Sequence, residues 1–92
     1  NELHVLKVIM GIRALDLEAG ITNDYLAETQ TDRKILSISR ELILVADHTK
    51  CERISSVSLA PLSIVHTFVT DSRAPSEFTS ALRERGIRVL TV

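Results

Sequence analysis

Apolar residues along this 92-residue chain gather in short runs that polar turns separate. The run Leu42–Ala46 has five consecutive apolar residues and therefore no polar face. Such a run is typical of a strand that is covered on both sides, as in a parallel sheet. Comparable runs lie at His4–Met10, Ile64–Thr70 and Ile87–Val92, so we expect a sheet built around Leu42–Ala46.

Helical patterns fill two of the intervals between these runs. The first helix is expected from about Asp24 to about Arg40, because three good N-cap residues, Thr22-Asn23-Asp24, stand at its start. One face of this helix, expected to point toward the sheet, carries Glu28, Thr31, Ile35 and Ile38. The second helix is expected to begin at Pro75 and to stop at Gly86, which suits the position after a helix end.

Two further segments have weaker patterns. Ile12–Thr22 is expected to be a loop with a break at Gly20. Cys51–Ser63 is expected to hold at most a short edge strand, which Pro61 ends. The remaining order is strand–helix–strand, twice, with no hairpin signal. That order predicts an α/β fold in which βαβ units form a mainly parallel sheet.

Composition narrows the function classes. The chain carries 11 Lys and Arg against 12 Asp and Glu, so it is not expected to bind DNA by itself. The single cysteine, Cys51, excludes an internal disulfide and favours the reducing cytoplasm. No apolar run approaches the roughly 20 residues of a membrane helix, and no leader is recognised, so no membrane partner is expected. The abrupt apolar start after Asn1 indicates a fragment, and the length allows one small domain.

The residues that follow the Leu42–Ala46 run form the first candidate site. Ligands of open α/β sheets bind outside the carboxyl ends of the strands, which is where Asp47 and Lys50 are expected. A carboxylate accepts hydrogen bonds from sugar hydroxyls, and an ammonium group attracts a phosphate or another anion. The alternative is a structural pair, in which Asp47 caps the turn and Lys50 is solvated.

Other polar residues are candidates for the same edge of the sheet. Thr70 and Asp71 end the Ile64–Thr70 run, and Asp16 lies in the loop after the first strand. For each of the two acids, a role in capping a turn is the alternative. Glu28 is either a carboxylate of the site or a residue that stabilises the start of its helix through the helix dipole.

Metal and nucleotide chemistry have little support. His48 and Cys51 have the i, i+3 spacing of a ligand pair, but a closed zinc site needs four ligands, and His4 and His66 fall inside expected strands. The three glycines form neither a Gly-x-Gly-x-x-Gly nor a Walker pattern, and no Gly-x-Ser-x-Gly elbow is present. We therefore expect no metal, no cofactor and no catalytic residue.

Four ordered blocks resemble the carboxy-terminal sensor domain of DeoR-family transcriptional repressors: Gly11–Thr22, Glu28, Leu44–Lys50 and Val69–Asp71. The resemblance covers nearly the whole chain and is nearest to members that regulate sugar and amino-sugar catabolism. It implies the Rossmann-like fold of ribose-5-phosphate isomerase, glucosamine-6-phosphate deaminase and the CoA transferases. It also implies a phosphorylated sugar as the effector, whose binding releases repression.

The effector-binding residues of that family match six positions of this chain: Asp16, Glu28, Asp47, Lys50, Thr70 and Asp71. The segment Asp47–Lys50 matches the family's Asp-x-x-Lys motif, and Thr70-Asp71 matches its Thr-Asp pair. The chain departs from the family's pattern at Ala14, where Gly is usual, and at Cys51-Glu52, where Phe-Gly is common. These departures change the shape expected for the pocket.

On this interpretation, residues 1–92 are the carboxy-terminal part of an effector-sensing domain. The resemblance implies that a winged helix-turn-helix for operator DNA, and a first sensor half with a Gly-rich phosphate loop, are absent from this chain. The expected protein is a homo-oligomeric repressor and not an enzyme. Two alternatives are a sugar-phosphate isomerase or deaminase of the same fold, and an oligomerisation module, because unpaired strand edges and apolar faces favour self-association.

Overall fold

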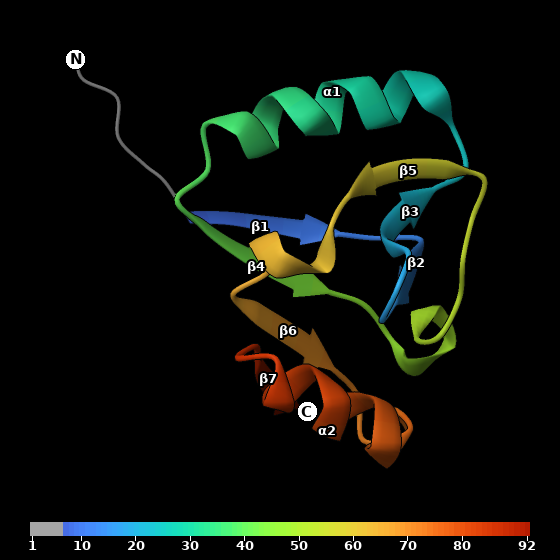
Figure 1. Cartoon of the computed structure of the whole chain (residues 1–92), viewed down its shortest axis with the longest axis vertical. Helices are drawn as coiled ribbons and strands as arrows, with labels where there is room; N and C mark the ends of the chain where they lie inside the picture. The colour runs from blue at the N-terminus through green and yellow to red at the C-terminus, as the bar shows by residue number, and fades with distance from the viewer. Residues whose placement is uncertain (1–6) are drawn as a thin grey trace.

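The structure is a computed structural model and describes residues 7–92. Its larger sheet has four parallel strands in the order β1-β4-β6-β7 (Figure 1). Their bounds are Lys7–Gly11 for β1, Glu41–Val45 for β4, Thr67–Thr70 for β6 and Arg88–Thr91 for β7. The expected α/β fold with a mainly parallel sheet is confirmed. The part of the predicted strand His4–Met10 that precedes Lys7 lies outside the described residues.

A second sheet is antiparallel, with the strand order β2-β3-β5. The bounds of these strands are Ala14–Asp16, Gly20–Asn23 and Val57–Ala60. The prediction of a loop over Ile12–Thr22 was wrong, because β2 and β3 form a hairpin there, with Asp16 opposite Gly20. Strands of three and four residues are too short to show a clear alternation of apolar and polar residues. The short edge strand expected before Pro61 is β5.

Gly20 allows this hairpin to lie close to the segment that follows β5. Its φ is +75°, a left-handed conformation that is unfavourable for residues with a Cβ. A Cβ at this position would lie 2.5 Å from the carbonyl oxygen of Ala60 and 3.0 Å from the nitrogen of Leu62. Backbone conformation and space therefore both require glycine here.

Within residues 7–92, the remaining elements are two α-helices and two 3₁₀ turns: α1 (Leu26–Ser37), α2 (Ser76–Glu84), η1 (His48–Lys50) and η2 (Leu62–Ile64). The second helix agrees with its prediction, since Pro75 precedes it and Gly86 follows its end with φ +88°. The Ile87 N–H closes the helix end by donating to the Leu82 carbonyl oxygen at 3.1 Å. Neither α-helix is long and apolar enough to cross a membrane.

The first helix differs from its prediction in length and in orientation. α1 is shorter than the expected Asp24–Arg40, and it packs mainly against β5 and β3 (Figure 1). Thr29 is its buried residue, whereas Ile35 and Ile38, predicted to face the sheet, are 38% and 59% exposed. The small sheet explains this error, because it occupies the core position that α1 was expected to fill. Glu28 is exposed as well.

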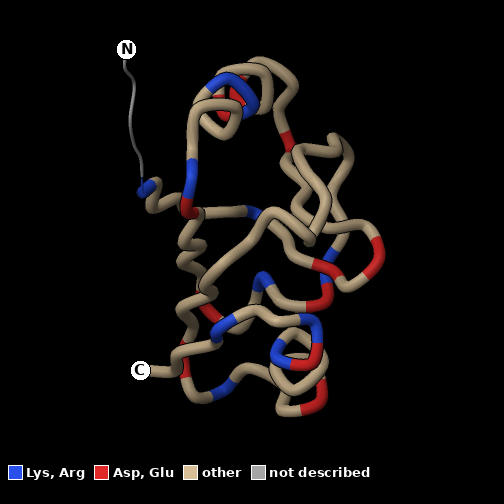
Figure 2. The backbone as a smooth tube through the Cα atoms, turned by 60° about the vertical axis from the view of Figure 1, so that its left-hand side comes forward, with Lys and Arg blue, Asp and Glu red and all other residues tan. Residues whose placement is uncertain are grey.

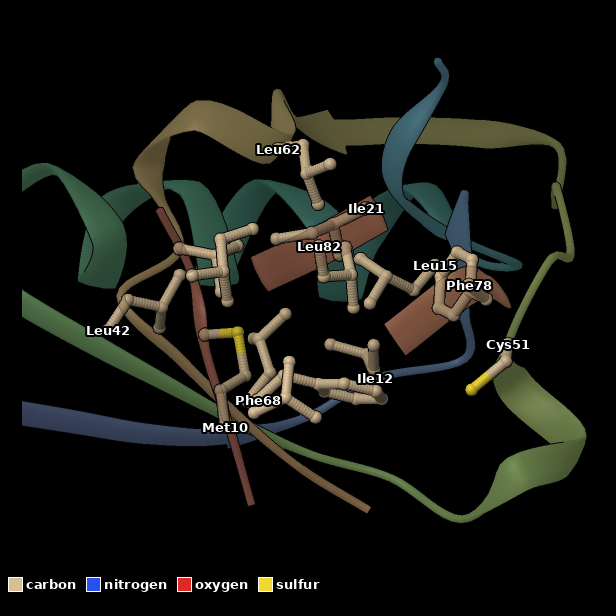
Figure 3. Close-up of a cluster of buried hydrophobic side chains, with 14 of the residues drawn as sticks. Met10, Ile12, Leu15, Ile21, Leu42, Cys51, Leu62, Phe68, Phe78 and Leu82 are labelled. Carbon is tan, nitrogen blue, oxygen red and sulfur yellow. The ribbon is translucent and has the colours of Figure 1, made fainter. Parts of the chain in front are cut away.

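The hydrophobic core lies on one face of the parallel sheet. Leu42, Leu44 and Phe68 project from that face and are at most 1% exposed. The small sheet, α2 and the η2 turn supply the opposing side chains, among them Leu15 and Leu82 (Figure 3). The carboxyl end of β1 leads into the loop before β2, and the carboxyl end of β4 leads into the loop before η1.

The other face of the parallel sheet is open. Ile9 is 71%, Val45 42% and Leu90 45% exposed, although each lies inside a strand. The prediction that Leu42–Ala46 is covered on both sides was therefore wrong for the chain as it stands. The apolar composition of this strand reflects one buried face and one apolar face that no described residue covers.

Candidate functional site

A cavity of about 440 Å³ opens at the carboxyl ends of β1 and β4. Its polar lining residues are Arg13, Asn23, Glu28, Asp32, Asp47 and Lys50. Gly11 ends β1 and Val45 ends β4, and both border the cavity. This is the position at which open α/β sheets bind ligands, because the loops there carry variable side chains on a fixed sheet.

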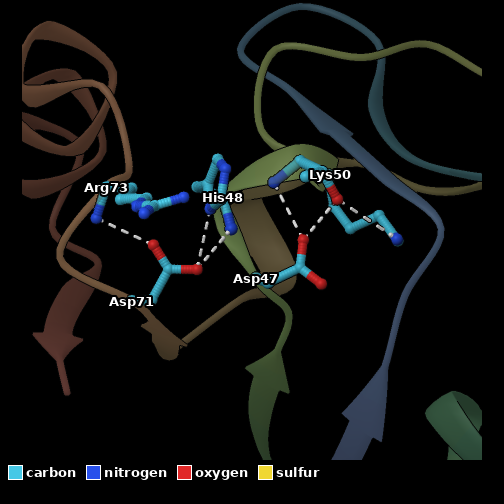
Figure 4. Close-up of polar contacts among 6 residues, drawn as sticks. Asp47, His48, Lys50, Asp71 and Arg73 are labelled. Atoms are coloured by element: carbon cyan, nitrogen blue, oxygen red, sulfur yellow. Dashed lines mark hydrogen bonds and ion pairs between the residues drawn. The ribbon is translucent and has the colours of Figure 1, made fainter.

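Asp47 is the N-cap residue of the η1 turn, and Lys50 is the last residue of that turn (Figure 4). One Asp47 oxygen, Oδ1, accepts hydrogen bonds from the Thr49 backbone N–H at 2.8 Å and from the Thr49 hydroxyl. These two bonds, the hydroxyl bond first, lower the pKa of Asp47 below its ordinary value. Lys50 donates from Nζ to the Thr49 Oγ1 at 3.3 Å. Asp47 therefore caps the turn and remains an ionised acceptor at neutral pH.

Glu28 contributes to the cavity from the first turn of α1. Asp32 lies one turn further along the same helix and accepts a hydrogen bond from the Asn23 side-chain amide at 3.3 Å. Asn23 is only 5% exposed, and this bond joins the middle of α1 to the end of β3. The cavity wall thus presents two carboxylates from α1 and one amide from the end of β3.

Asp71 lies beside the cavity, and its carboxylate interacts with the backbone N–H groups of His48 and Arg73 and with the His48 ring (Figure 4). Its Oδ2 accepts the His48 backbone N–H at 2.9 Å and lies 2.9 Å from the His48 ring Nδ1. Its Oδ1 accepts the Arg73 backbone N–H at 2.8 Å. The His48 side-chain and backbone bonds lower the pKa of Asp71 to about 2. Asp71 thereby connects the loop after β6 to the η1 turn.

Thr70 does not line the main cavity. Its side chain is 3% exposed, and its hydroxyl has no hydrogen-bond partner in the described part of the chain. Thr70 and Asp71 border a separate, mostly apolar cavity of about 200 Å³, which shares Val45, Ala46 and Asp47 with the larger one. The predicted Thr-Asp pair is therefore next to the main cavity, not within its lining.

Asp16 is occupied by the β2–β3 turn. Its Oδ2 accepts the backbone N–H groups of Glu18 and Ala19, both at 2.9 Å. It is not among the residues that line the 440 Å³ cavity. The structure thus places Glu28, Asp47 and Lys50 around one cavity and leaves Asp16, Thr70 and Asp71 outside its lining.

Three polar lining residues were not predicted from the sequence: Arg13, Asn23 and Asp32. Arg13 follows the end of β1, so the strand-end rule that selected Asp47 applied to it equally. Asp32 is four residues after Glu28 and therefore shares its helix face. Asn23 had no local signal, because it was assigned to a helix cap rather than to the end of a strand.

Metal binding receives no support from the geometry of residues 7–92. They contain no group of three or more His, Cys, Asp or Glu side chains that is able to hold a metal ion. Cys51 is buried, and burial is the main cause that raises the pKa of its thiol. His4, one of the histidines weighed as a ligand, lies outside the described residues.

Charged residues of both signs are interspersed along the described chain (Figure 2). Lys and Arg do not form a continuous stripe on the tube drawn there, in keeping with the formal net charge of −1. The local exception is the group of cationic residues around Lys50. Within the described residues, this grouping of Lys and Arg is local to the two cavities that Lys50 lines.

Comparison with known proteins gives consistent matches along the chain. A family model described as the DeoR C terminal sensor domain matches residues 1–72. A transcriptional regulator of the sgc region in Escherichia coli (strain K12) is 33% identical over 97% of this chain and 34% of its own length. Glycerol-3-phosphate regulon repressors of Escherichia coli (strain K12) and Haemophilus influenzae are 30% and 33% identical, over 88% and 89% of this chain and 32% of their own lengths. The chain spans about a third of the length of these relatives.

Proposed function

This chain belongs to the DeoR family, within the carboxy-terminal sensor domain, and from that premise we propose that it binds a phosphorylated sugar as the effector of a transcriptional repressor. The observation that carries the proposal is the 440 Å³ cavity at the carboxyl ends of β1 and β4. It combines carboxylates with cationic groups, the combination that a ligand with hydroxyls and a phosphate requires. The expected effector class is also in keeping with two relatives that are named as glycerol-3-phosphate regulon repressors.

In the proposed site, Lys50 neutralises negative charge on the effector. Asp47 and Glu28 accept hydrogen bonds from the hydroxyls of the sugar. The lowered pKa of Asp47 supports this role, because an ionised carboxylate is an acceptor at both oxygens and its Oδ1 alone is used by Thr49. Asp71 acts through His48, by holding the η1 turn and hence Lys50 in position.

Thr70 and Asp16 support the site from outside its lining. Thr70 lies beside buried Cys51, the residue that follows η1, and Asp16 holds the β2–β3 turn. The effector would act by population shift, binding one arrangement of the sensor more tightly than another. The sensor would pass this preference to a winged helix-turn-helix in the cytoplasm, which makes the contact with operator DNA.

A regulator needs no turnover, and we propose that this chain is not an enzyme. Its relatives in the comparisons above are named as transcriptional regulators or repressors. The competing function is a sugar-phosphate isomerase or deaminase, in which a carboxylate of the same cavity moves a proton. Conversion of any sugar phosphate by the chain, measured by following substrate and product, would favour that competitor.

We further propose that the sensor forms homo-oligomers through the open face of the parallel sheet, with a second copy as the occupant. In register, Ile9 lies beside Ile43, and Val45 beside Val69 and then Leu90. The exposed apolar residues thus form a continuous patch, which is rare on a monomer surface. A two-fold dimer places the same patch on both partners, so one such surface is sufficient.

The test of effector binding is an amide NMR titration of the chain with a panel of sugar phosphates, with each position assigned. The expected result is a set of saturable shifts centred on Asp47–Lys50 and Glu28. Lys50→Met should weaken binding about tenfold or more, because a hydrogen bond to a charged group is lost. Lys34→Met, which removes a cation of α1 outside the cavity lining, should leave affinity unchanged. A folded chain that shows no shift with any sugar phosphate would contradict the proposal.

A further inference from the structure

Among the described residues, the larger sheet ends on one side at β7, which pairs with β6 alone. The N–H groups of Arg88 and Val92 donate to carbonyl oxygens of the β6 segment, at 3.0 and 2.9 Å. Because the backbone groups of successive strand residues point to alternate sides, the N–H and C=O groups of Val89 and Thr91 point outward, away from β6. The outer edge of β7 is therefore a row of backbone donors and acceptors with which another strand can pair.

One of these outward groups is occupied by a side chain. Arg83, in the last turn of α2, donates from Nη2 to the Val89 carbonyl oxygen at 3.2 Å. The guanidinium group reaches this oxygen because α2 packs against β7. Arg83 thus takes an acceptor that an added strand would use, and it places a positive charge at the edge of the sheet.

The edges of the smaller sheet are covered in a comparable way. Arg33 of α1 donates from Nη2 to the Ser58 carbonyl oxygen of the edge strand β5. At the other edge, β2, the Leu15 carbonyl oxygen accepts the Arg53 N–H at 3.3 Å. Proteins protect sheet edges with charged side chains and covering segments, because an exposed edge favours pairing with other chains. Arg83 and Arg33 thus give an edge of each sheet the same kind of protection.

We propose that the outer edge of β7 is a surface for strand addition by a second copy of this chain, and that Arg83 keeps this surface closed. A second copy fits because two β7 strands related by a two-fold axis are antiparallel and offer each other the same row of backbone groups. Leu90 in β7 and Val92 after it are 45% and 86% exposed, so pairing also buries apolar surface. This surface differs from the open face, since it uses backbone groups at the edge of the sheet rather than side chains on its face.

The experiment compares Arg83→Met with wild type by sedimentation and by amide hydrogen exchange, each at two protein concentrations. Arg83→Met should strengthen self-association about tenfold or more, because several backbone hydrogen bonds then form between two copies. The amides of Val89 and Thr91 should become protected from exchange as the concentration of this variant rises. In wild type, these outward amides should exchange rapidly at both concentrations.

Arg85→Met is the matched control. Arg85 also donates to a backbone carbonyl oxygen, that of Leu17 at 2.7 Å, but Leu17 lies in the β2–β3 turn and not in an edge strand. This variant should leave the exchange of the Val89 and Thr91 amides unchanged. Adding Thr91→Pro to Arg83→Met should reverse the association, because proline removes an outward donor and leaves the bonds to β6 intact. Pairing through β1, the other edge strand of this sheet, does not involve Arg83 and is therefore equal in all of these proteins.

Two results contradict the proposal. One is self-association that Arg83→Met leaves unchanged. The other is stronger association without protection of the Val89 and Thr91 amides, or with the same increase in Arg85→Met, because a general loss of structure then explains it. Thermal unfolding of each variant identifies such a loss. Neither result bears on effector binding, which does not use this edge of the sheet.

Discussion

His48 and Asp71 are joined twice through a single carboxylate oxygen. The His48 backbone N–H donates to Asp71 Oδ2 at 2.9 Å, and the His48 ring Nδ1 lies 2.9 Å from the same atom. The two residues are 23 positions apart and follow neighbouring strands, β4 and β6. Their contact holds together the two loops at the carboxyl edge of the sheet, including the turn that ends at Lys50.

This contact predicts a specific dependence of stability on acid pH. His48 donors lower the pKa of Asp71 to about 2 in the folded chain, from an ordinary value of 3.8. The ionised form is therefore favoured by folding, and its stabilising contribution is complete above about pH 4 and is lost as the pH falls toward 2. Asp71→Asn should lower the melting temperature at pH 7, and its difference from wild type should shrink between pH 4 and 2.

Glu77→Gln is the matched control for this experiment, because it removes a carboxylate from the start of the nearby helix α2. Thermal unfolding of the three proteins, followed by circular dichroism at several pH values, provides the comparison. A difference between wild type and Asp71→Asn that stays constant from pH 7 to pH 2 would show that Asp71 does not act through its charge.

Gly20→Ala should strongly destabilise the chain. The left-handed conformation costs an alanine about 1–2 kcal/mol, and overpacking typically costs about 1–3 kcal/mol more. Gly86→Ala separates the two effects, because Gly86 also has a positive φ but has no atom within 4 Å of the position that a Cβ would occupy. Chemical denaturation should therefore show a clearly larger loss for Gly20→Ala. Equal losses would mean that the β5–η2 backbone moves aside without cost.

Cys51 should react slowly with thiol reagents in the folded chain. It is 7% exposed, and burial raises the pKa of its thiol, so both access and the thiolate fraction are reduced. Because it is the only cysteine of the chain, colour release from a disulfide reagent reports on it alone. Denaturant should accelerate the reaction markedly at pH 8. A native rate equal to the denatured rate would show that the η1 region opens readily.

Ile9→Asp should weaken self-association without much loss of stability. Ile9 is 71% exposed on the open face, and exposed substitutions usually change the free energy of unfolding by within about 0.5 kcal/mol. Ile54→Asp is the matched control, since Ile54 is 66% exposed but lies outside the strands. Sedimentation at two concentrations measures association. If both variants or neither reduce it, the open face of the sheet is not the interface.

Local sequence patterns were sufficient for the parallel sheet and for the second helix. Apolar runs marked β4 and β6, and the Pro75 and Gly86 signals bounded α2, because each of these features depends on a few neighbouring residues. The same reasoning selected Asp47 and Lys50 at the end of β4, where the structure has a cavity. The effector role of these residues stays a prediction.

Tertiary structure alone decided the small sheet and the surroundings of the site. The hairpin of β2 and β3 is completed by β5, more than thirty residues later, and its presence moved α1 away from the parallel sheet. Arg13 and Arg53 meet only because the segment after η1 pairs with Leu15. Pairings between distant segments depend on packing of the whole chain, and the local periodicity of apolar residues does not predict them. The sequence by itself thus determined which strands and helix ends form, and packing determined which side chains share a cavity.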